Sequence, residues 1–466
     1  MIARTFLLFF TFSFILSIDV TAQDTLRISY DEFISRVMNS SGQVKYMREN
    51  IDLAENRVEQ AKAQRFLPNM RFESQHGLVP GVKSDSLLPN GNPLPDDEYY
   101  LDPNLRNDWN DWGIYTKFNL SAAQPIFVWG GISKSIDAAR KGAEAVRLQT
   151  ESKEEDLKVK LFDLYYSFVL AFEIERLLDE ATEKIGQIER QINKMEEEGD
   201  PDLNPAEVFK FQIFKSEFDI QIEEVKRNME FVRETWNYLL SDGTDAVYEP
   251  ETRFLDPLPY KLAPIGFYQS TAFDNRADLQ ALKFGKQATE TYIEALKRQN
   301  YPGLYLGGFV NYAFTPNRPY QDNPFIINNT NYFNGGAAFA IRVNLNFFSI
   351  KANIERSKIE LRRVDFAQQA AREGAILQVN ENYRKAALAD VKMKKTDEAL
   401  LTAKKWLRSE QLDYDLGFGD VKNLTDAMKK ELELKLKLMQ STFEYNSSVA
   451  KLNKSAGLPL TTPIEN

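Results

Sequence analysis

The chain has 466 residues, of which 27% are charged, and its formal net charge is -10 at pH 7. Its mean hydropathy is -0.44, and no apolar stretch of about 18 residues follows the N-terminal segment, which excludes transmembrane helices there. The acidic balance, with no clustered basic patch, argues against a nucleic-acid partner. Cysteine is absent and His76 is the only histidine, so neither a thiolate site nor a histidine-based triad or metal cluster can form. We therefore expect no enzyme activity and no cofactor.

The chain opens with a positive charge followed by a short apolar run. Arg4 precedes the run from Phe6 to Leu16, and the small residues of Val20-Thr21-Ala22 suit a signal peptidase. The run is short for the ~20 apolar residues of a membrane span, although an uncleaved anchor is the alternative. We expect residues 1–22 to be a secretory signal peptide and Gln23 to begin the mature chain.

Three long segments, 126–200, 206–249 and 325–458, contain no proline and are therefore free to form uninterrupted helices. In the first, apolar residues recur in alternating steps of four and three, a heptad seam with one slip between Ala171 and Ile174. A single helix from Ser133 to Glu198 would be on the order of 100 Å long. The seam consists of Leu157, Leu161, Leu164, Phe168, Ala171, Ile174, Leu178, Ala181, Ile185, Ile188, Ile192 and Met195.

A turn and a second seam follow. In "EEEGDPDLNPAEV", Gly199 is a helix stop, Asn204 an N-cap and Pro205 a first helical residue. The next segment repeats the same rhythm, with Lys215 as its one polar member. Because the turn is short, the two helices must run back along each other as a coiled-coil hairpin. The second seam consists of Val208, Phe211, Lys215, Phe218, Ile222, Val225, Met229, Val232, Trp236 and Leu239.

An internal repeat organises the chain. "AENRVEQAKAQRFLP", Ala54 to Pro68, aligns without a gap on "ATETYIEALKRQNYP", Ala288 to Pro302. Each copy leads into two possible strands and two long helices, so we predict an α+β, mainly α fold built from a duplicated unit. The predicted divisions are a first repeat over 23–240 (β-hairpin about 69–124, helical hairpin about 133–240), a linker over 241–264, a second repeat over 265–458 (β-hairpin about 303–348, helical hairpin about 351–456) and a tail over 459–466.

The strands show a period of two. In "GGAAFAIRVNLNFFS", Gly335 to Ser349, one parity is apolar and the other is small or polar. Alternating strands of about ten residues with aromatic ends are typical of outer-membrane barrels, and long loops over 79–111 and 315–336 occur on one side only. A small soluble sheet packed on helices is the alternative. In the barrel interpretation the lipid-facing residues of this strand are Phe339, Ile341, Val343 and Leu345.

Four strands cannot close a barrel, because the smallest barrels have about eight strands. An open edge is not tolerated in hydrocarbon, where every backbone group needs a partner. The sequence therefore predicts that several chains contribute their hairpins to one barrel.

Three segments carry a resemblance to a known family: "LPNMRFE" from Leu67, "NLSAAQPIFVWGG" from Asn119 and "YDLGFGDVKNLTDA" from Tyr414. They resemble matching segments of the outer-membrane efflux protein family, the TolC-like channels, in the same order over nearly the whole mature chain. The resemblance implies a homotrimer with a twelve-stranded barrel in the outer membrane of a Gram-negative bacterium and an α-helical barrel in the periplasm. It also implies a periplasmic adaptor and an inner-membrane transporter as partners.

The resemblance marks a candidate pore constriction. Tyr414 matches a family tyrosine three positions before the glycine of the second turn, Asp426 matches one ring-forming acid, and Asn423 stands where another would be. Three Asp426 carboxylates around one axis would repel each other and attract cations. A solvated aspartate and an ordinary packing tyrosine are the alternatives. Gly419 replaces an arginine that ties the closed state in some members.

The two helical turns are candidate adaptor contacts, because glycine allows a positive φ and the close approach of a partner's backbone. Their alternative role is that of tight helix connections. The competing function is a soluble periplasmic coiled-coil adaptor or scaffold, although such a protein should have one helical hairpin rather than two. The candidate contact residues are Gly199, Asp200, Gly417, Phe418 and Gly419.

Overall fold

The computed structural model describes residues 25–95, 102–199, 204–240, 246–320, 323, 325–416 and 421–461, so the predicted signal peptide lies outside the described residues. The elements are β1 (Thr25–Ile28), α1 (Tyr30–Ser40), α2 (Gly42–Ala63), β2 (Asn69–Lys83), β3 (Arg106–Phe127), α3 (Gly131–Glu198), α4 (Pro205–Leu240), β4 (Val247–Pro250), α5 (Ile265–Asn275), α6 (Ala277–Arg298), β5 (Gly303–Phe314), β6 (Tyr332–Arg342), α7 (Phe347–Asp415) and α8 (Val421–Ser455).

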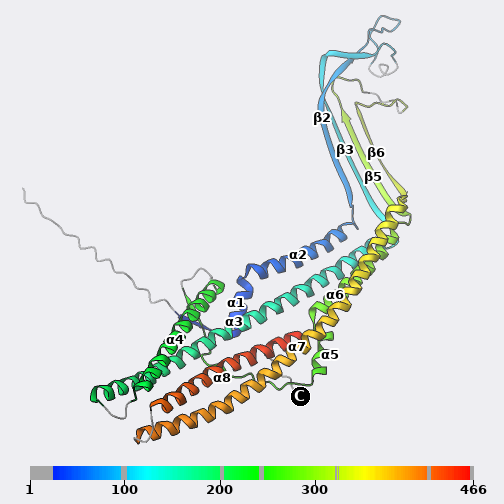
Figure 1. The fold of residues 1–466 in the computed structure, drawn as a ribbon. Helices are drawn as coiled ribbons and strands as arrows, with labels where there is room; N and C mark the ends of the chain where they lie inside the picture. Colours follow the sequence, from blue (N-terminus) through cyan, green and yellow to red (C-terminus); the bar gives the residue numbers. More distant parts are fainter. Residues whose placement is uncertain are drawn as a thin grey trace, which may run out of the picture.

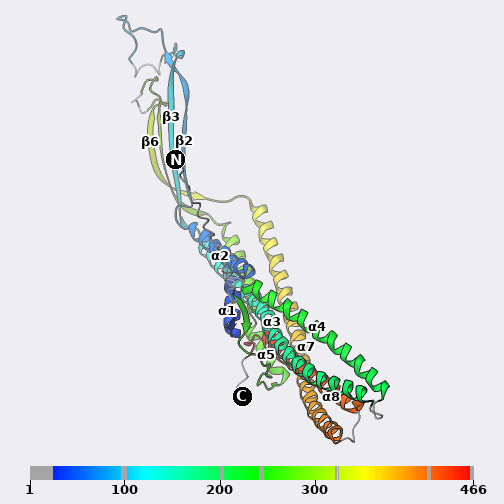
Figure 2. The ribbon, with the colours of Figure 1, turned by 90° about the vertical axis from the view of Figure 1, so that its left-hand side faces the viewer.

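The element order repeats: two shorter helices, two strands, a very long helix and a helix of half its length. The long helices α3 and α7 have 68 and 69 residues, and their partners α4 and α8 have 36 and 35. Figures 1 and 2 show the strands projecting from one end of the helices, with none of the described helices over either face of the sheet. The predicted fold class, mainly helical with a smaller sheet, is confirmed. None of the described helices is long and apolar enough to cross a membrane.

The two β-hairpins form one four-stranded sheet in the order β2-β3-β5-β6. All three pairings are antiparallel, and within the sheet the two repeats meet where β3 pairs with β5, with Leu120 opposite Val310. The outer edges of the sheet, β2 and β6, have no strand partner within the described chain.

The last strand is shorter than the alternating pattern predicts. β6 ends at Arg342, so Val343 and Leu345 lie beyond the strand and Phe347 begins α7. The prediction that the strand includes Val343 and Leu345 was wrong because the partner strand β5 begins at Gly303, which pairs with Arg342. Beyond Arg342 no backbone of β5 remains to pair with.

The helical hairpins have the ends and seams that the sequence indicates. Asn204 accepts a hydrogen bond from the Ala206 amide at 3.0 Å, as an N-cap does. The polar member of the α4 seam, Lys215, bonds Glu189 of α3 at 2.5 Å. Since α4 is about half as long as α3, it accompanies only part of that helix, and α3 also contacts α2, α6 and α8.

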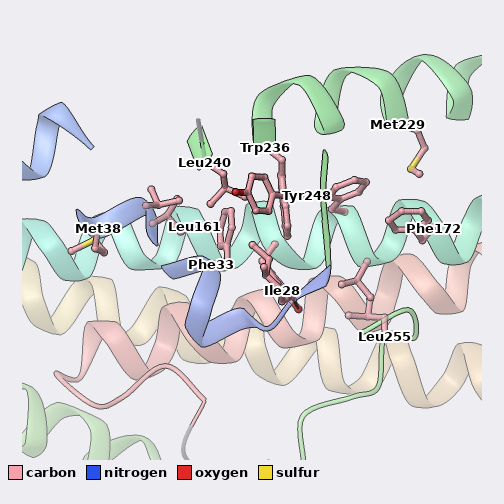
Figure 3. Packing of buried hydrophobic residues seen from close by; sticks show 14 of the residues in the cluster. Ile28, Phe33, Met38, Leu161, Phe172, Met229, Trp236, Leu240, Tyr248 and Leu255 are labelled. Atoms are coloured by element: carbon pink, nitrogen blue, oxygen red, sulfur yellow. Dashed lines mark hydrogen bonds between the residues drawn. The ribbon is translucent and has the colours of Figure 1, made fainter. Parts of the chain in front are cut away.

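The slip in the α3 seam marks a change of packing partners. Phe172 belongs to an apolar cluster that includes α1 and β4, whereas Ile174 belongs to a cluster shared with α4 and α8. Figure 3 shows the first cluster, in which Trp236 of α4 is fully buried and stacks on Phe33 of α1 at 4.4 Å between ring centroids. The adjoining strands β1 and β4 pair in parallel and tie the N-terminal segment to the connection between the repeats.

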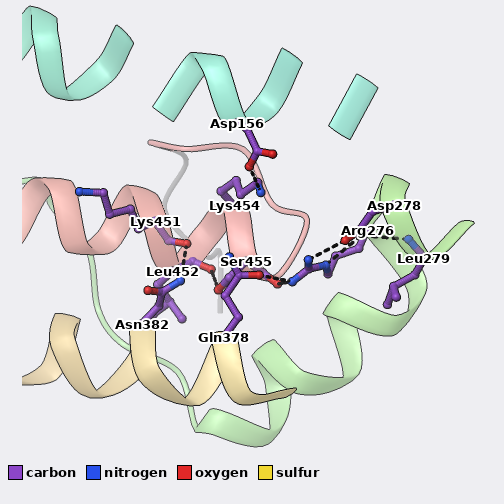
Figure 4. Close-up of polar contacts among 10 residues, drawn as sticks. All are labelled: Asp156, Arg276, Asp278, Leu279, Gln378, Asn382, Lys451, Leu452, Lys454 and Ser455. Carbon is purple, nitrogen blue, oxygen red and sulfur yellow. Dashed lines mark hydrogen bonds and ion pairs between the residues drawn. The ribbon is translucent and has the colours of Figure 1, made fainter. Parts of the chain in front are cut away.

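A cluster of polar contacts joins the start of α6 to α7 and to the end of α8 (Figure 4). The Arg276 guanidinium bonds the Asp278 carboxylate at 2.7 Å, the Gln378 side chain at 2.8 Å and the Ser455 carbonyl at 3.1 Å. Gly457, with φ +70°, lies so close to Asn275 that a Cβ would approach its carbonyl carbon at 2.8 Å. The end of α8 is thereby held against the start of α6.

Candidate functional site

The ends of the two helical hairpins lie together at one end of the molecule. The hydroxyl of Tyr414, near the end of α7, donates a weak hydrogen bond to the Met195 sulfur of α3 at 3.8 Å. Tyr414 also packs on the apolar cluster that α3 and α4 share with α8 through Val421 and Met428. Tyr414 is therefore placed where it links one hairpin to the other.

Asn423 and Asp426 lie one turn apart on the exposed side of α8, while Leu424 and Ala427 of the same turns are buried. The structure thus separates the predicted constriction residues into two environments. Tyr414 packs between the hairpins, and the two α8 residues face away from the buried side of their helix. Both residues are exposed in the described chain.

The first helical turn has the backbone geometry that requires glycine. Gly199 ends α3 with φ 64° and ψ 37°, a left-handed conformation. No atom lies within 4 Å of the position that a Cβ would take, so the requirement is conformational rather than steric. The other proposed contact residues, Asp200, Gly417, Phe418 and Gly419, lie outside the described residues.

One face of the sheet is apolar across all four strands. The register places Phe72 beside Leu120 and Leu306 beside Phe339. Many of these side chains are exposed, Phe339 at 72% and Ile341 at 74%. The face comprises Met70, Phe72, Leu78, Ile114, Phe118, Leu120, Leu306, Val310, Tyr312, Phe339 and Ile341. It is an apolar band that nothing in the described chain covers, interrupted where the polar residues Ser74, His76 and Thr116 share the face.

The opposite face is predominantly polar, because alternate residues of each strand point to it. Phe309 is an aromatic exception, and its ring lies against Gly336, 3.2 Å from where a Cβ would stand. The polar side chains of this face are Arg71, Glu73, Gln75, Lys117, Asn119, Ser121, Asn311, Asn334 and Arg342. The sheet therefore separates an apolar environment from a polar one.

The structure shows a second apolar stripe on α4 that the heptad pattern does not predict. Opposite the buried face of that helix, the exposed residues Phe209, Ile213, Ile220, Phe231 and Tyr238 follow one line. The signal was present, because positions four, seven and eleven residues apart share a side of a helix. The heptad seam describes only the face of α4 that contacts α3, so it does not include this second stripe.

Three solved structures show what this arrangement is similar to. The outer membrane protein VceC of Vibrio cholerae is 14% identical, with a TM-score of 0.66 over 92% of this chain and 96% of that one. The MtrE outer membrane channel of Neisseria gonorrhoeae, in its open state, is 14% identical, with a TM-score of 0.68 over 94% and 91%. The CmeC outer membrane channel of Campylobacter jejuni is 14% identical, with a TM-score of 0.66 over 93% and 87%.

No family model and no curated protein matches the chain. The matched structures are outer-membrane proteins and channels rather than enzymes. Their similarity extends over both repeats, the sheet and the long helices alike. The chain therefore has the fold of outer-membrane channels, and the resemblance to TolC-like channels in its sequence is confirmed at the level of the fold.

Proposed function

We propose that this chain is an outer-membrane channel, the exit duct of a tripartite efflux or type I secretion system in a Gram-negative bacterium. It passes substrates from an inner-membrane transporter and a periplasmic adaptor to the outside. The observation that carries the proposal is the sheet itself, with an exposed apolar band on one face, polar side chains on the other and two edges that lack a strand partner among the described residues.

The apolar band faces lipid. A soluble protein seldom leaves so many large apolar side chains uncovered on one surface. In a membrane barrel the outward side chains contact hydrocarbon and the inward ones line a polar channel. Phe339 and Ile341 then point outward, whereas Lys117 and Arg342 point into the lumen.

Closure of the barrel requires more than one copy of the chain. The free edges of β2 and β6 must find partners, because unpaired backbone groups are costly in hydrocarbon. Three copies of the four-stranded sheet supply twelve strands, enough for a barrel. The outer stripe of α4, with Ile213 and Phe231 exposed at 60% and 68%, would be covered by the neighbouring copy.

The long helices extend the channel into the periplasm. At about 1.5 Å per residue, α3 and α7 reach on the order of 100 Å from the sheet. Their far ends would meet the adaptor through Gly199, Asp200 and the turn formed by Gly417, Phe418 and Gly419. The constriction would lie just above, at Asp426, Asn423 and Tyr414.

The test compares two glutamate substitutions in neighbouring positions of β6. Phe339→Glu places a charge on the lipid face. At the membrane midplane a basic residue on that face lowers the stability of a barrel by about 2–4 kcal/mol, and an acidic residue lowers it by less. Ala338→Glu places the same charge on the polar face. We expect wild type and Ala338→Glu to be extracted from the outer membrane only with detergent and to have the native mass of a trimer.

Phe339→Glu should be depleted from that fraction. Equal membrane yield for both variants would contradict the assignment of the faces. A wild-type protein that stays soluble without detergent would replace the channel with the alternative, a periplasmic coiled-coil adaptor or scaffold.

A further inference from the structure

A cavity of about 570 Å³ lies where the sheet meets the helices. Its walls come from the start of β2, the connection from β3 to α3, the end of α6, the start of β5 and the end of β6. Figure 1 shows these segments converging at the base of the strands. The cavity thus occupies the transition from barrel to helices.

The charged side chains that line this cavity are all basic. Arg298 and Arg342 line it, and none of its lining residues is an aspartate or glutamate. By contrast, the cavity between α1, α3 and α6 has charges of both signs. It is lined by Asp31, Glu151, Glu155 and Asp278 and also by Lys158, Arg276 and Lys454. A wall with two guanidinium groups and no carboxylate is unexpected in a chain whose net charge is -10.

No ion pair of the described chain joins either guanidinium to a carboxylate, and the acid nearest to Arg298 in sequence, Glu294, is bound to another cation. Glu294 stands one turn before Arg298, but its carboxylate bonds Lys134 at 2.6 Å. The hydrogen bond from Lys134 is the main cause that holds the pKa of Glu294 below its ordinary value, and the charge of Arg298 is a smaller cause. The nearby acid is therefore already paired with another cation.

Both guanidinium groups are nevertheless held in place. Arg298 donates to the Trp129 carbonyl, and it passes so close to Gly130 that a Cβ there would lie 3.2 Å from its Nη1. Gly130 also has φ +71°, a left-handed conformation that favours glycine, which explains one half of the glycine pair Gly130-Gly131. Arg342 lies over the Tyr305 ring, 5.0 Å from its centroid.

Arg298 and Arg342 retain N–H donors that these contacts do not use. A guanidinium carries five N–H donors in a planar fork that matches phosphate and carboxylate oxygens. Amides and phenols on the same walls, among them Gln64, Asn69 and Tyr301, add neutral donors. The first turn of α3, which also lines the cavity, contains no acidic residue.

The cavity opens toward the polar side of the sheet. Tyr305 pairs with Ala340 and Gly303 with Arg342, so both cavity side chains share the face of Lys117 and Asn311. In the proposed barrel this face lines the lumen. An anion in the cavity would therefore lie in the path of exported solutes.

We propose that this cavity binds the phosphate or carboxylate group of a solute in transit, which makes anionic compounds a substrate class of the channel. The binding site stands on the geometry of the two arginines. The role in transit rests on the proposed function.

The first experiment measures binding of inorganic phosphate to the full-length protein in neutral detergent by equilibrium dialysis. The variants are Arg298→Gln, Arg342→Gln and the double substitution. Lys62→Gln is the control, because it removes one cation two residues before Gln64 without touching the cavity. Native mass and circular dichroism verify that each variant keeps its fold. We expect the dissociation constant to rise about tenfold for each arginine removed and to stay unchanged in the control.

The second experiment records conductance in planar bilayers with and without phosphate at constant ionic strength. We expect phosphate to reduce the wild-type current and to have little effect on the double variant. Phosphate binding without conductance would reject the proposed channel and leave the anion site intact. Conductance without phosphate binding, or binding that survives both substitutions, would overturn the site. Displacement of phosphate by phosphatidylglycerol, but not phosphatidylcholine, would show that lipid enters the cavity and would overturn the soluble substrate class.

Discussion

Arg276 shows how a single side chain holds helices that are far apart in the sequence. Its side chain is only 10% exposed, and its bonds reach Asp278 in α6, Gln378 in α7 and the Ser455 carbonyl in α8. A buried guanidinium needs such partners, because removing one member of a buried pair leaves the other uncompensated. The sequence offers no sign of this role, since the residue lies between two short helices.

We predict that Arg276→Gln lowers the free energy of unfolding by about 2 kcal/mol, because it removes the bonds to the buried Ser455 carbonyl and to the Asp278 carboxylate, which is 38% exposed and therefore partly screened by solvent. Urea unfolding of the detergent-solubilised protein provides the measurement. The control is Arg363→Gln, whose side chain is 80% exposed and pairs with Glu360 at 3.2 Å. That exposed pair should contribute less than about 1 kcal/mol. Equal losses in both variants would contradict the role of Arg276.

The same pair predicts a pH dependence. Burial alone would raise the pKa of Asp278, but the hydrogen bonds and charge of Arg276 hold it below its ordinary value. A carboxyl whose pKa is lower in the folded state stabilises the fold above its unfolded pKa, and this stability is lost as the pH falls through the folded pKa. The stability difference between wild type and Asp278→Asn should therefore be largest at neutral pH and shrink below about pH 4. A difference that stays constant over that range would rule out this contribution.

At the scale of elements, α4 is a helix with two apolar faces. Its inner face, with Phe211, Phe218 and Trp236, packs inside the chain. Its outer face, with Phe209, Ile213 and Ile220, is exposed. A helix that is apolar on both sides is expected to be buried on both sides, so the outer face indicates a further layer of protein.

We predict that the double variant Ile213→Gln, Ile220→Gln breaks the trimer without unfolding the chain. The two residues lie outside the described cores, so the helical content should persist while the contact between copies is lost. Native mass and circular dichroism measure the two properties separately. Lys210→Gln, at an exposed position off the stripe, should leave the trimer intact. A stable trimer of the double variant would show that this stripe is not the contact between copies.

At the scale of the whole molecule, the duplicated unit places the four-stranded sheet and the ends of the helical hairpins at opposite ends. The sheet forms one end, and Tyr414, Asn423 and Asp426 lie near the other, with the helices between them. The apolar cluster shared by α3, α4 and α8 holds the far ends of both hairpins together. The assembled trimer would then bring three copies of Asp426 around one axis.

We predict that Asp426→Asn weakens cation selectivity and block by divalent cations in planar bilayers. A ring of three carboxylates focuses negative potential in a narrow pore, and the amide removes it. Asp413→Asn, on the exposed side of α7, is the matched control and should change neither property. Unaltered selectivity and divalent block in Asp426→Asn would exclude the ring.

Much of the local structure could be predicted from the sequence. The proline-free segments and heptad steps predict helices that the structure has at Gly131–Glu198 and Pro205–Leu240. Asn204 and Gly199 mark helix ends through their own hydrogen bonds and dihedral angles. These signals are local, because a helix forms its backbone hydrogen bonds between residues four apart. The alternation of apolar with small or polar residues likewise predicts the apolar face of β6, because successive side chains of a strand point to opposite faces of the sheet.

The tertiary structure alone decided how the segments combine. It placed β3 beside β5, paired β1 with β4, and ended β6 at Arg342 where β5 has no further backbone to offer. It also gathered Arg298 and Arg342 into one cavity and showed that the outer side of α4 has no cover within the described chain. The physical reason is that strand hydrogen bonds and cavity walls join residues distant in sequence. A local pattern specifies which face is apolar, whereas only the folded chain specifies what that face meets.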